Sequence, residues 1–214
     1  HEGDFHAENI RIGNGEIIFD FVSPKGTIKD IKLGVPVSIN IDNGIAAMAL
    51  AQLCGATDEE LRRGMETFGG VDRRFDFKVK NERVVYLSDY AHHPSEIEQS
   101  VKSIRELYAD KKIAAIFQPH LYTRTRDHYR GFAEVLSLCD EVVMVPIYPA
   151  REEPIEGVCS EMIGQLLTVD WQLAEREELV ALLEKMSTDV VVTFGAGNID
   201  VVCSAVAELL KKRA

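Results

Sequence analysis

The stretch Leu87-Ser88-Asp89-Tyr90-Ala91-His92-His93-Pro94-Ser95-Glu96-Ile97 decides how the rest of the chain is read. The apolar run 84–87 before it is typical of a strand. After Pro94, apolar residues recur at helical spacing, and proline is tolerated in a first helical turn. Ser95 and Glu98 have the spacing of a capping box. One carboxylate and two imidazoles therefore lie between a strand and a helix, where open α/β sheets bind ligands. We predict a functional site there.

The chain around this stretch alternates between predicted strands and helices. We predict a hairpin of strands 77–80 and 83–87, and further strands at 113–117, 141–145 and 190–194. Helices are predicted from Pro94, at about 127–138, 160–167 and 175–186, and at the C-terminal end. This alternation is typical of a Rossmann-like α/β domain, a mostly parallel sheet with helices on both faces.

Residues 5–37 have a different pattern, in which β-branched and aromatic runs are separated by turn sequences. Such runs predict a small antiparallel sheet. An alanine-rich helix is expected over 40–53, and Thr57 with Glu60 forms a capping box that starts a second helix to about Phe68. Gly69-Gly70 breaks the pattern, so we place a domain boundary there, with domains 1–70 and 71–214.

The composition limits the classes of function. The net charge of −11 over 214 residues disfavours binding to nucleic acid or to an anionic membrane. No apolar run reaches the ~20 residues of a membrane helix. The four cysteines are scattered without metal-type spacing, which is typical of reduced thiols in a cytoplasmic protein. The chain does not begin with methionine, and we expect it to be part of a longer protein.

Polar or glycine-rich clusters follow four of the predicted strands. These clusters are 89–93, 120–126, 146–151 and 195–198. The carboxyl ends of parallel strands share one edge of a sheet, so the clusters are expected to converge.

The residues alone leave several kinds of chemistry open. His92-His93 could bind a metal, act in proton transfer or anion binding, or be a structural turn, although no carboxylate stands at the spacing of the common zinc motif. The guanidinium groups of Arg124 and Arg126 suit a carboxylate or phosphate. Gly195-Ala196-Gly197-Asn198 lacks the third glycine of a dinucleotide fingerprint. Glycine is nowhere followed by lysine, so this chain has no P-loop of its own.

Several motifs together resemble those of the Mur ligase family. The first is Asp89-Tyr90-Ala91-His92-His93-Pro94-Ser95-Glu96, which is similar to the family pattern D-Y-[GA]-H-H-P-[ST]-E. The others, in chain order, are the helix start at 40–47, Arg73-Arg74-Phe75, the segment 117–127 and Gly195–Ile199. Ile39 and Leu121 depart from the pattern, since the family usually has His and Arg at these positions.

The resemblance implies a three-domain, ATP-dependent ligase of peptidoglycan synthesis, of which this chain is the end of the central domain and the whole C-terminal domain. The likeness is greatest to members that join L-alanine to UDP-N-acetylmuramate through an acyl phosphate. ATP and Mg2+ would be bound mainly by upstream domains of the same protein.

The resemblance also implies roles for individual residues. Catalytic roles fall to Asp89, His93 and Arg74, and substrate binding to Tyr90, His92, His120, Arg124 and Arg126. Asn40 and Asn43 would contact the nucleotide, together with Arg74 and Asp89, and no metal ligand is assigned to this chain. Because Leu121 replaces arginine, the alanine carboxylate is expected to rely on Arg124 or Arg126.

Three other functions remain open at this point. The chain could belong to a recycling ligase of the same superfamily, which attaches a ready-made peptide. It could be a non-catalytic Rossmann-type module that binds a nucleotide or peptide. A hydrolase with a metal on the histidine pair is the third.

Overall fold

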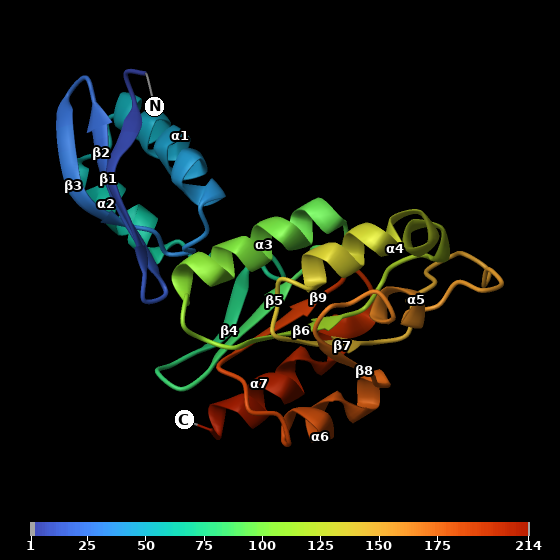
Figure 1. The fold of residues 1–214 in the computed structure, drawn as a ribbon. Helices are drawn as coiled ribbons and strands as arrows, with labels where there is room; N and C mark the ends of the chain where they lie inside the picture. The colour runs from blue at the N-terminus through green and yellow to red at the C-terminus, as the bar shows by residue number, and fades with distance from the viewer. Residues whose placement is uncertain (1–2, 214) are drawn as a thin grey trace. The chain divides into compact units, whose positions relative to one another are not determined.

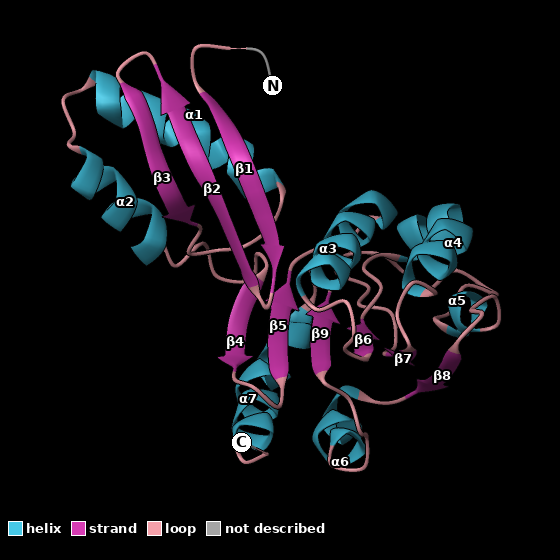
Figure 2. Ribbon diagram, turned by 60° about the vertical axis from the view of Figure 1, so that its left-hand side comes forward, coloured by secondary structure: helices cyan, strands magenta, loops and turns pink. Residues whose placement is uncertain are grey.

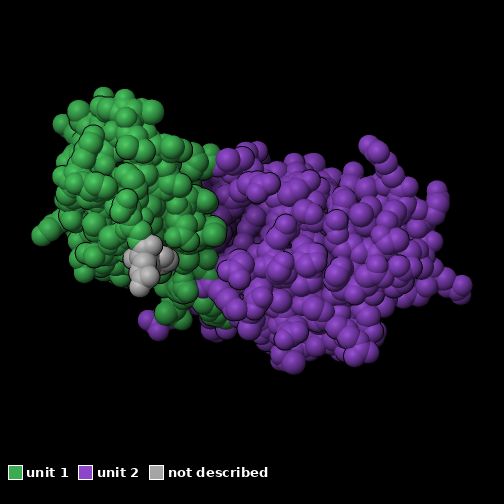
Figure 3. Space-filling model, turned by 90° about the horizontal axis from the view of Figure 1, so that it is seen from above, with its two compact units in different colours: residues 1–70, 103–109 green, residues 71–102, 110–214 purple. Residues whose placement is uncertain are grey.

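The computed structural model describes residues 3–213. The chain forms two compact units (Figure 3). The first comprises the residues up to Gly70 together with Ser103–Ala109, and the second comprises Val71–Lys102 and the residues from Asp110 onward.

The first unit contains the predicted antiparallel sheet. Its strands β1 (His6–Gly13), β2 (Glu16–Ser23) and β3 (Gly26–Lys32) are paired in chain order, which confirms the meander. Asn14 and Gly15 make the first turn with positive φ at both positions, as a tight hairpin requires. Alternate side chains of β2, among them Ile17, Phe19 and Phe21, are buried.

Two helices cover one face of this sheet (Figure 2). Helix α1 spans Ile39–Leu53 and α2 spans Asp58–Thr67, close to the predicted bounds. The capping box before α2 is present: Thr57 Oγ1 accepts from the Glu60 amide at 3.3 Å, and the Glu60 carboxylate accepts from the Thr57 amide at 2.8 Å. Two of the otherwise free amides at the start of α2 are satisfied in this way.

The second unit is built on a six-stranded sheet in the order β4-β5-β9-β6-β7-β8. Its strands are β4 (Asp76–Lys80), β5 (Val85–Asp89), β6 (Ile113–Phe117), β7 (Glu141–Met144), β8 (Asp170–Leu173) and β9 (Val190–Phe194). Only β4 is antiparallel to its neighbour; β5, β9, β6, β7 and β8 are all parallel. The last strand in the chain thus lies at the centre of the sheet, and all five residues of β6 and of β9 are buried.

Helices cover both faces of this sheet, as predicted (Figure 1). On one side lie α3 (Pro94–Leu107) and α4 (Tyr122–Leu136), where Phe132 packs 5.0 Å from Phe117 of β6 between ring centroids. On the other side α6 (Leu179–Leu183) and α7 (Cys203–Lys211) pack on Tyr86, Val191 and Ile116 in one apolar core. The mixed α/β fold predicted from the sequence is confirmed.

Three predicted helices had the wrong bounds, and one strand was missed. Helix α4 begins at Tyr122, five residues before the expected start. The region 175–186 is a 3-10 turn, η1 (Arg176–Glu178), followed by the short α6, and α5 spans only Glu161–Gly164. Strand β8 was missed because its four residues, Asp170–Leu173, form a very short segment without a β-branched residue.

The start of α3 also differs from the prediction. Ser95 lies inside the helix, and Glu98 pairs with Lys102 instead. It is the Glu96 carboxylate that accepts from the amides of His92 (2.9 Å) and His93 (3.2 Å). Capping therefore comes from within the motif and fixes its backbone. Within residues 3–213, no helix has both the length and the apolar character needed to cross a bilayer.

Candidate functional site

The clusters that follow β5, β6, β7 and β9 meet at the carboxyl edge of the parallel sheet. Asp89 and Phe117 are both in register with Phe194, which places the ends of three strands side by side. His120 and Tyr148, which follow β6 and β7, form an isolated parallel bridge. The predicted convergence is therefore present in the structure.

Asp89 is the last residue of β5 and is half-buried. Its carboxylate accepts hydrogen bonds from the Ala91 amide at 3.2 Å and from the hydroxyl of Ser100 on α3. Burial raises the pKa of Asp89 above its usual range, and the hydrogen bonds from Ser100 and Ala91 only partly offset this. A carboxylate at the end of a strand, kept there although burial disfavours its charged form, is typical of a functional site.

The two adjacent arginines have different surroundings. Arg73 Nη2 donates to the carbonyls of Gly195 (2.9 Å) and Gly197 (3.0 Å), and its Nη1 lies 3.3 Å from the carboxylate of Asp200. Arg74, which the motif had suggested for catalysis, is exposed. Arg73 therefore fastens the strand–helix turn after β9, and its neighbour is left open to solvent.

A row of aromatic rings runs along the carboxyl edge. From Tyr90 to His92 the ring centroids are 5.3 Å apart, from His92 to His120 they are 6.1 Å apart, and from His120 to Tyr148 5.7 Å. His92 Nδ1 lies 2.9 Å from the carbonyl oxygen of Tyr90, which orients its ring. Three of these four residues were predicted site residues, and the structure brings them together.

Arg124 joins this row from the first turn of α4. Its Nη1 lies 3.4 Å from His120 Nδ1. Burial lowers the pKa of His120, and the positive charge of Arg124 and the nearby His92 lower it further, while Glu152 opposes the shift. His120 is therefore a neutral imidazole at pH 7, able to accept a proton, beside a guanidinium that is always charged.

Two predicted residues lie apart from this row. His93 packs against His128 of α4, with ring centroids 4.8 Å apart, and its Nδ1 is 2.8 Å from the Ser95 hydroxyl. Arg126 is exposed and forms an ion pair with the adjacent Asp127 at 2.8 Å. Both residues belong to the motifs, yet their side chains have partners outside the row.

Tyr148, Gln118 and Asn198 lie in the polar clusters and motifs recognised from the sequence, although no role was predicted for them. Gln118 Nε2 donates to Asn198 Oδ1 at 3.0 Å, which joins the ends of β6 and β9. A Cβ on Gly197 would lie 2.6 Å from Tyr148 Cγ and 2.6 Å from Gln118 Oε1, so only glycine fits this turn. Gly195 and Gly197 were the sequence signal for this turn. The backbone passes close to neighbouring side chains there, and this explains the two glycines better than nucleotide binding does.

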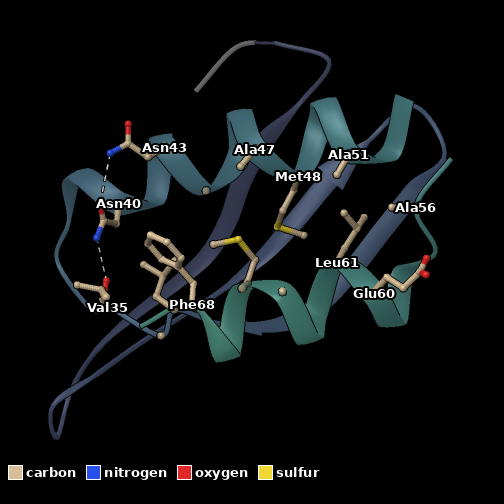
Figure 4. Close-up of a pocket in the computed structure, with 15 residues that line it drawn as sticks. Val35, Asn40, Asn43, Ala47, Met48, Ala51, Ala56, Glu60, Leu61 and Phe68 are labelled. Atoms are coloured by element: carbon tan, nitrogen blue, oxygen red, sulfur yellow. Dashed lines mark hydrogen bonds between the residues drawn. The ribbon is translucent and has the colours of Figure 1, made fainter. Parts of the chain in front are cut away.

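The first unit has a pocket of about 430 Å³ between α1, α2 and the segment 33–35 that follows β3 (Figure 4). Its walls are mostly apolar and include Met48, Leu61 and Phe68, and Asn40 and Asn43 stand at one end. Asn40 Nδ2 donates to the Val35 carbonyl at 3.1 Å and Asn43 Nδ2 to Asn40 Oδ1 at 3.2 Å. No lysine or arginine is among the residues that line it, so its chemistry suits a flat base better than phosphates.

Residues 3–213 contain no group of three or more His, Cys, Asp or Glu side chains placed to hold a metal ion. The described part of the chain thus offers the carboxyl-edge row and the apolar pocket as sites, and each lies within one of the two units.

Comparison with known proteins places these features in context. Residues 73–197 match the family model described as "Mur ligase, glutamate ligase domain". The chain is 62% identical to a UDP-N-acetylmuramate–L-alanine ligase of Phocaeicola vulgatus over 214 residues, 99% of this chain and 47% of the relative. It is 53% identical to the ligase of that name from Parabacteroides distasonis, over 98% of this chain and 46% of the relative.

A solved structure of a ligase with a similar name also resembles this chain. The UDP-N-acetylmuramate-alanine ligase MurC of Thermotoga maritima superposes with a TM-score of 0.78 at 26% identity, over 100% of this chain and 47% of that one. This chain spans about half the length of the curated relatives it matches.

Proposed function

Because this chain belongs to the Mur ligase family, we propose that it forms the C-terminal half of an ATP-dependent ligase that joins L-alanine to UDP-N-acetylmuramate. The observation that carries the proposal is the convergence of Asp89, His92, His120 and Arg124 from two separate motifs at one sheet edge. The names of the relatives with 62% and 53% identity support alanine as the amino acid.

In the proposed reaction, ATP phosphorylates the muramyl carboxylate and the alanine amine then attacks the acyl phosphate, which expels inorganic phosphate. Arg124 binds the alanine carboxylate through its planar guanidinium. Neutral His120, whose pKa is lowered by burial, takes up the proton that the amine loses as the amide bond forms. His92 and Tyr90 form the wall beside His120.

The nucleotide is proposed to contact this chain in two places. The apolar pocket with Asn40 and Asn43 at its end suits the adenine ring, because carboxamides can pair with its polar edge. Arg74 is exposed and free to reach a phosphate, and Asp89 lies near the reacting groups. Mg2+ and the phosphates are assigned to the upstream domains, where the family has its P-loop, and the whole protein is proposed to work in the cytoplasm.

The test is an assay of the full-length protein with UDP-N-acetylmuramate, ATP and either L-alanine or a free tripeptide. Alanine should be ligated with release of phosphate, the tripeptide should not, and the isolated 214-residue chain should be inactive. Asp89→Ala should lower turnover at least about 100-fold, the scale of a lost acid–base or electrostatic group. Preference for the tripeptide would reassign the protein to peptide recycling, and near wild-type turnover of Asp89→Ala would remove Asp89 from the site.

A further inference from the structure

The segment that follows β7 contacts the start of α4 through backbone hydrogen bonds and a ring stack. The Tyr148 amide donates to the Pro119 carbonyl at 2.8 Å, and the Tyr148 carbonyl accepts from the Leu121 amide at 2.9 Å. The Tyr148 ring stacks on His120 at an interplanar angle of 28°. This segment therefore supports the backbone on both sides of His120.

Helix α4 lacks a cap of its own. Its N-cap residue is Leu121, whose side chain cannot accept a hydrogen bond and whose φ of 72° is one that a leucine rarely adopts. A strained residue of this kind persists only where its surroundings hold it in place. The first turn of α4, which carries Arg124, needs a partner from elsewhere in the chain.

That partner is Glu152. Its carboxylate accepts from the Thr123 amide at 3.0 Å and from the Thr123 hydroxyl at 2.5 Å. These hydrogen bonds hold the pKa of Glu152 below its usual range, so the group is charged at neutral pH. A negative charge at this point also favours the positive end of the helix dipole.

Glu152 also acts on His120 electrostatically. The charged or titratable groups that influence His120 are Arg124 on α4, His92 before α3 and Glu152 after β7. Glu152 is the only one of these that favours the protonated imidazole. The same carboxylate therefore fixes the helix start that carries Arg124 and counters the lowered pKa of His120.

We propose that Glu152 is a positioning residue of the ligase site, which holds His120 and Arg124 in the arrangement that receives the amino acid. Glu152 acts through Thr123 and the first turn of α4, not by touching the substrate. The inference rests on the proposed function for its kinetic consequence, but the geometry and the titration of His120 can be measured independently of any reaction.

The experiment compares Glu152→Ala, Glu152→Gln and the control Glu153→Gln in the full-length protein. Alanine removes both hydrogen bonds, so we expect the KM for L-alanine to rise about tenfold or more, the scale of a lost charge-assisted pair, with a smaller change in kcat. Glutamine can still pair with the Thr123 amide and hydroxyl but lacks the charge, so its KM should stay near the wild-type value. Glu153 is the exposed neighbour, and its substitution should change neither quantity.

A second measurement follows the His120 ring by NMR in protein labelled at histidine. Without the carboxylate charge, the pKa of His120 should fall in Glu152→Gln, and the limb of the pH–rate profile that belongs to His120 should move to lower pH. A purely structural role would leave the Glu152→Gln titration at its wild-type position. Thr123→Ser keeps the hydroxyl and should behave as wild type, while Thr123→Val should share part of the KM defect.

The outcomes separate the two proposals. An unchanged KM in Glu152→Ala together with an unmoved His120 titration in Glu152→Gln would overturn the role of Glu152. A titration that moves while the KM for alanine stays constant would keep Glu152 as the residue that positions His120, and would instead contradict the assignment of His120 and Arg124 to the alanine site. If Glu152→Ala does not fold, the Glu152→Gln titration and Thr123→Val kinetics decide the question.

Discussion

The guanidinium of Arg73 lies 4.8 Å from the centroid of the Tyr90 ring, and the Arg73 carbonyl accepts a hydrogen bond from the Tyr90 amide at 2.6 Å. The same guanidinium donates to the carbonyls of Gly195 and Gly197. Arg73 therefore connects the residue that follows β5 with the turn that follows β9, two sides of the candidate site. Only a planar, multiply donating side chain can lie over the Tyr90 ring and donate to both carbonyls at once.

Substitution of Arg73 by lysine should lower the free energy of unfolding by about 1–2 kcal/mol, because an ammonium cannot reproduce the pair of carbonyl contacts and the stacking on Tyr90. Arg74→Lys is the matched control, since Arg74 is exposed, and it should leave the unfolding midpoint unchanged. Urea unfolding of both variants measures the difference. Equal stabilities would show that the contacts of Arg73 contribute little.

The adjacent histidines should respond differently to substitution. His92 faces the row that contains His120, so His92→Ala should raise the KM for L-alanine about tenfold. His93 packs on His128, so His93→Ala should change this KM less than about threefold and act on stability through the lost contact. Steady-state kinetics of the two variants in the full-length protein test this, and a larger KM effect from His93 would place that ring in the alanine site.

Asp89 should stabilise the fold less when it is charged than when it is neutral. Burial raises its pKa in the folded state, so the native protein binds the proton more tightly than the unfolded chain does. The stability that neutral Asp89 contributes is fully present below about pH 4, the pKa of an aspartate in the unfolded chain. This contribution is lost as the pH rises through the pKa of Asp89 in the folded protein.

Asp89→Asn should therefore raise the thermal midpoint at pH 7 while turnover falls at least about 100-fold. The gain should shrink as the pH falls through the folded pKa of Asp89, because the wild-type carboxyl then becomes neutral as well. Asparagine can still accept from the Ala91 amide and donate to Ser100, so its packing is preserved. A lower midpoint at pH 7 would mean that the charge stabilises the fold.

Substitutions of Asn40 and Asn43 should affect folding stability and nucleotide binding differently. Asn40 donates to the Val35 carbonyl, so Asn40→Ala should cost about 1 kcal/mol of folding free energy. Asn43 is exposed, and Asn43→Ala should change stability by less than about 0.5 kcal/mol but weaken ATP binding about tenfold. Calorimetric titration with ATP, alongside thermal unfolding, distinguishes the two effects. Unchanged ATP affinity in both variants would remove the apolar pocket from the nucleotide site.

Much of the second unit could be predicted because its strongest signals are local. The buried runs at 113–117 and 190–194 are short, β-branched and bounded by polar turns, and they became β6 and β9. Strand β8 carries no such signal in its sequence. Its conformation is decided by its pairing with β7 at the edge of the sheet. The start of α4 was placed too late because Leu121 is a poor cap. The residue that compensates, Glu152, lies 29 positions beyond its hydrogen-bond partner Thr123 in the chain.

The sequence by itself determined the α/β alternation, the antiparallel sheet and the motifs whose polar residues follow four strand ends, since periodicity and turn chemistry act over a few neighbouring positions. Only the tertiary structure decided which side chains of those motifs meet. It placed Arg73 and not Arg74 on the turn after β9, turned His92 toward His120 and His93 toward His128, and set Tyr148 and Glu152 against the start of α4. The direction of a side chain depends on partners that are distant in the chain, and adjacent residues of one motif can find different ones.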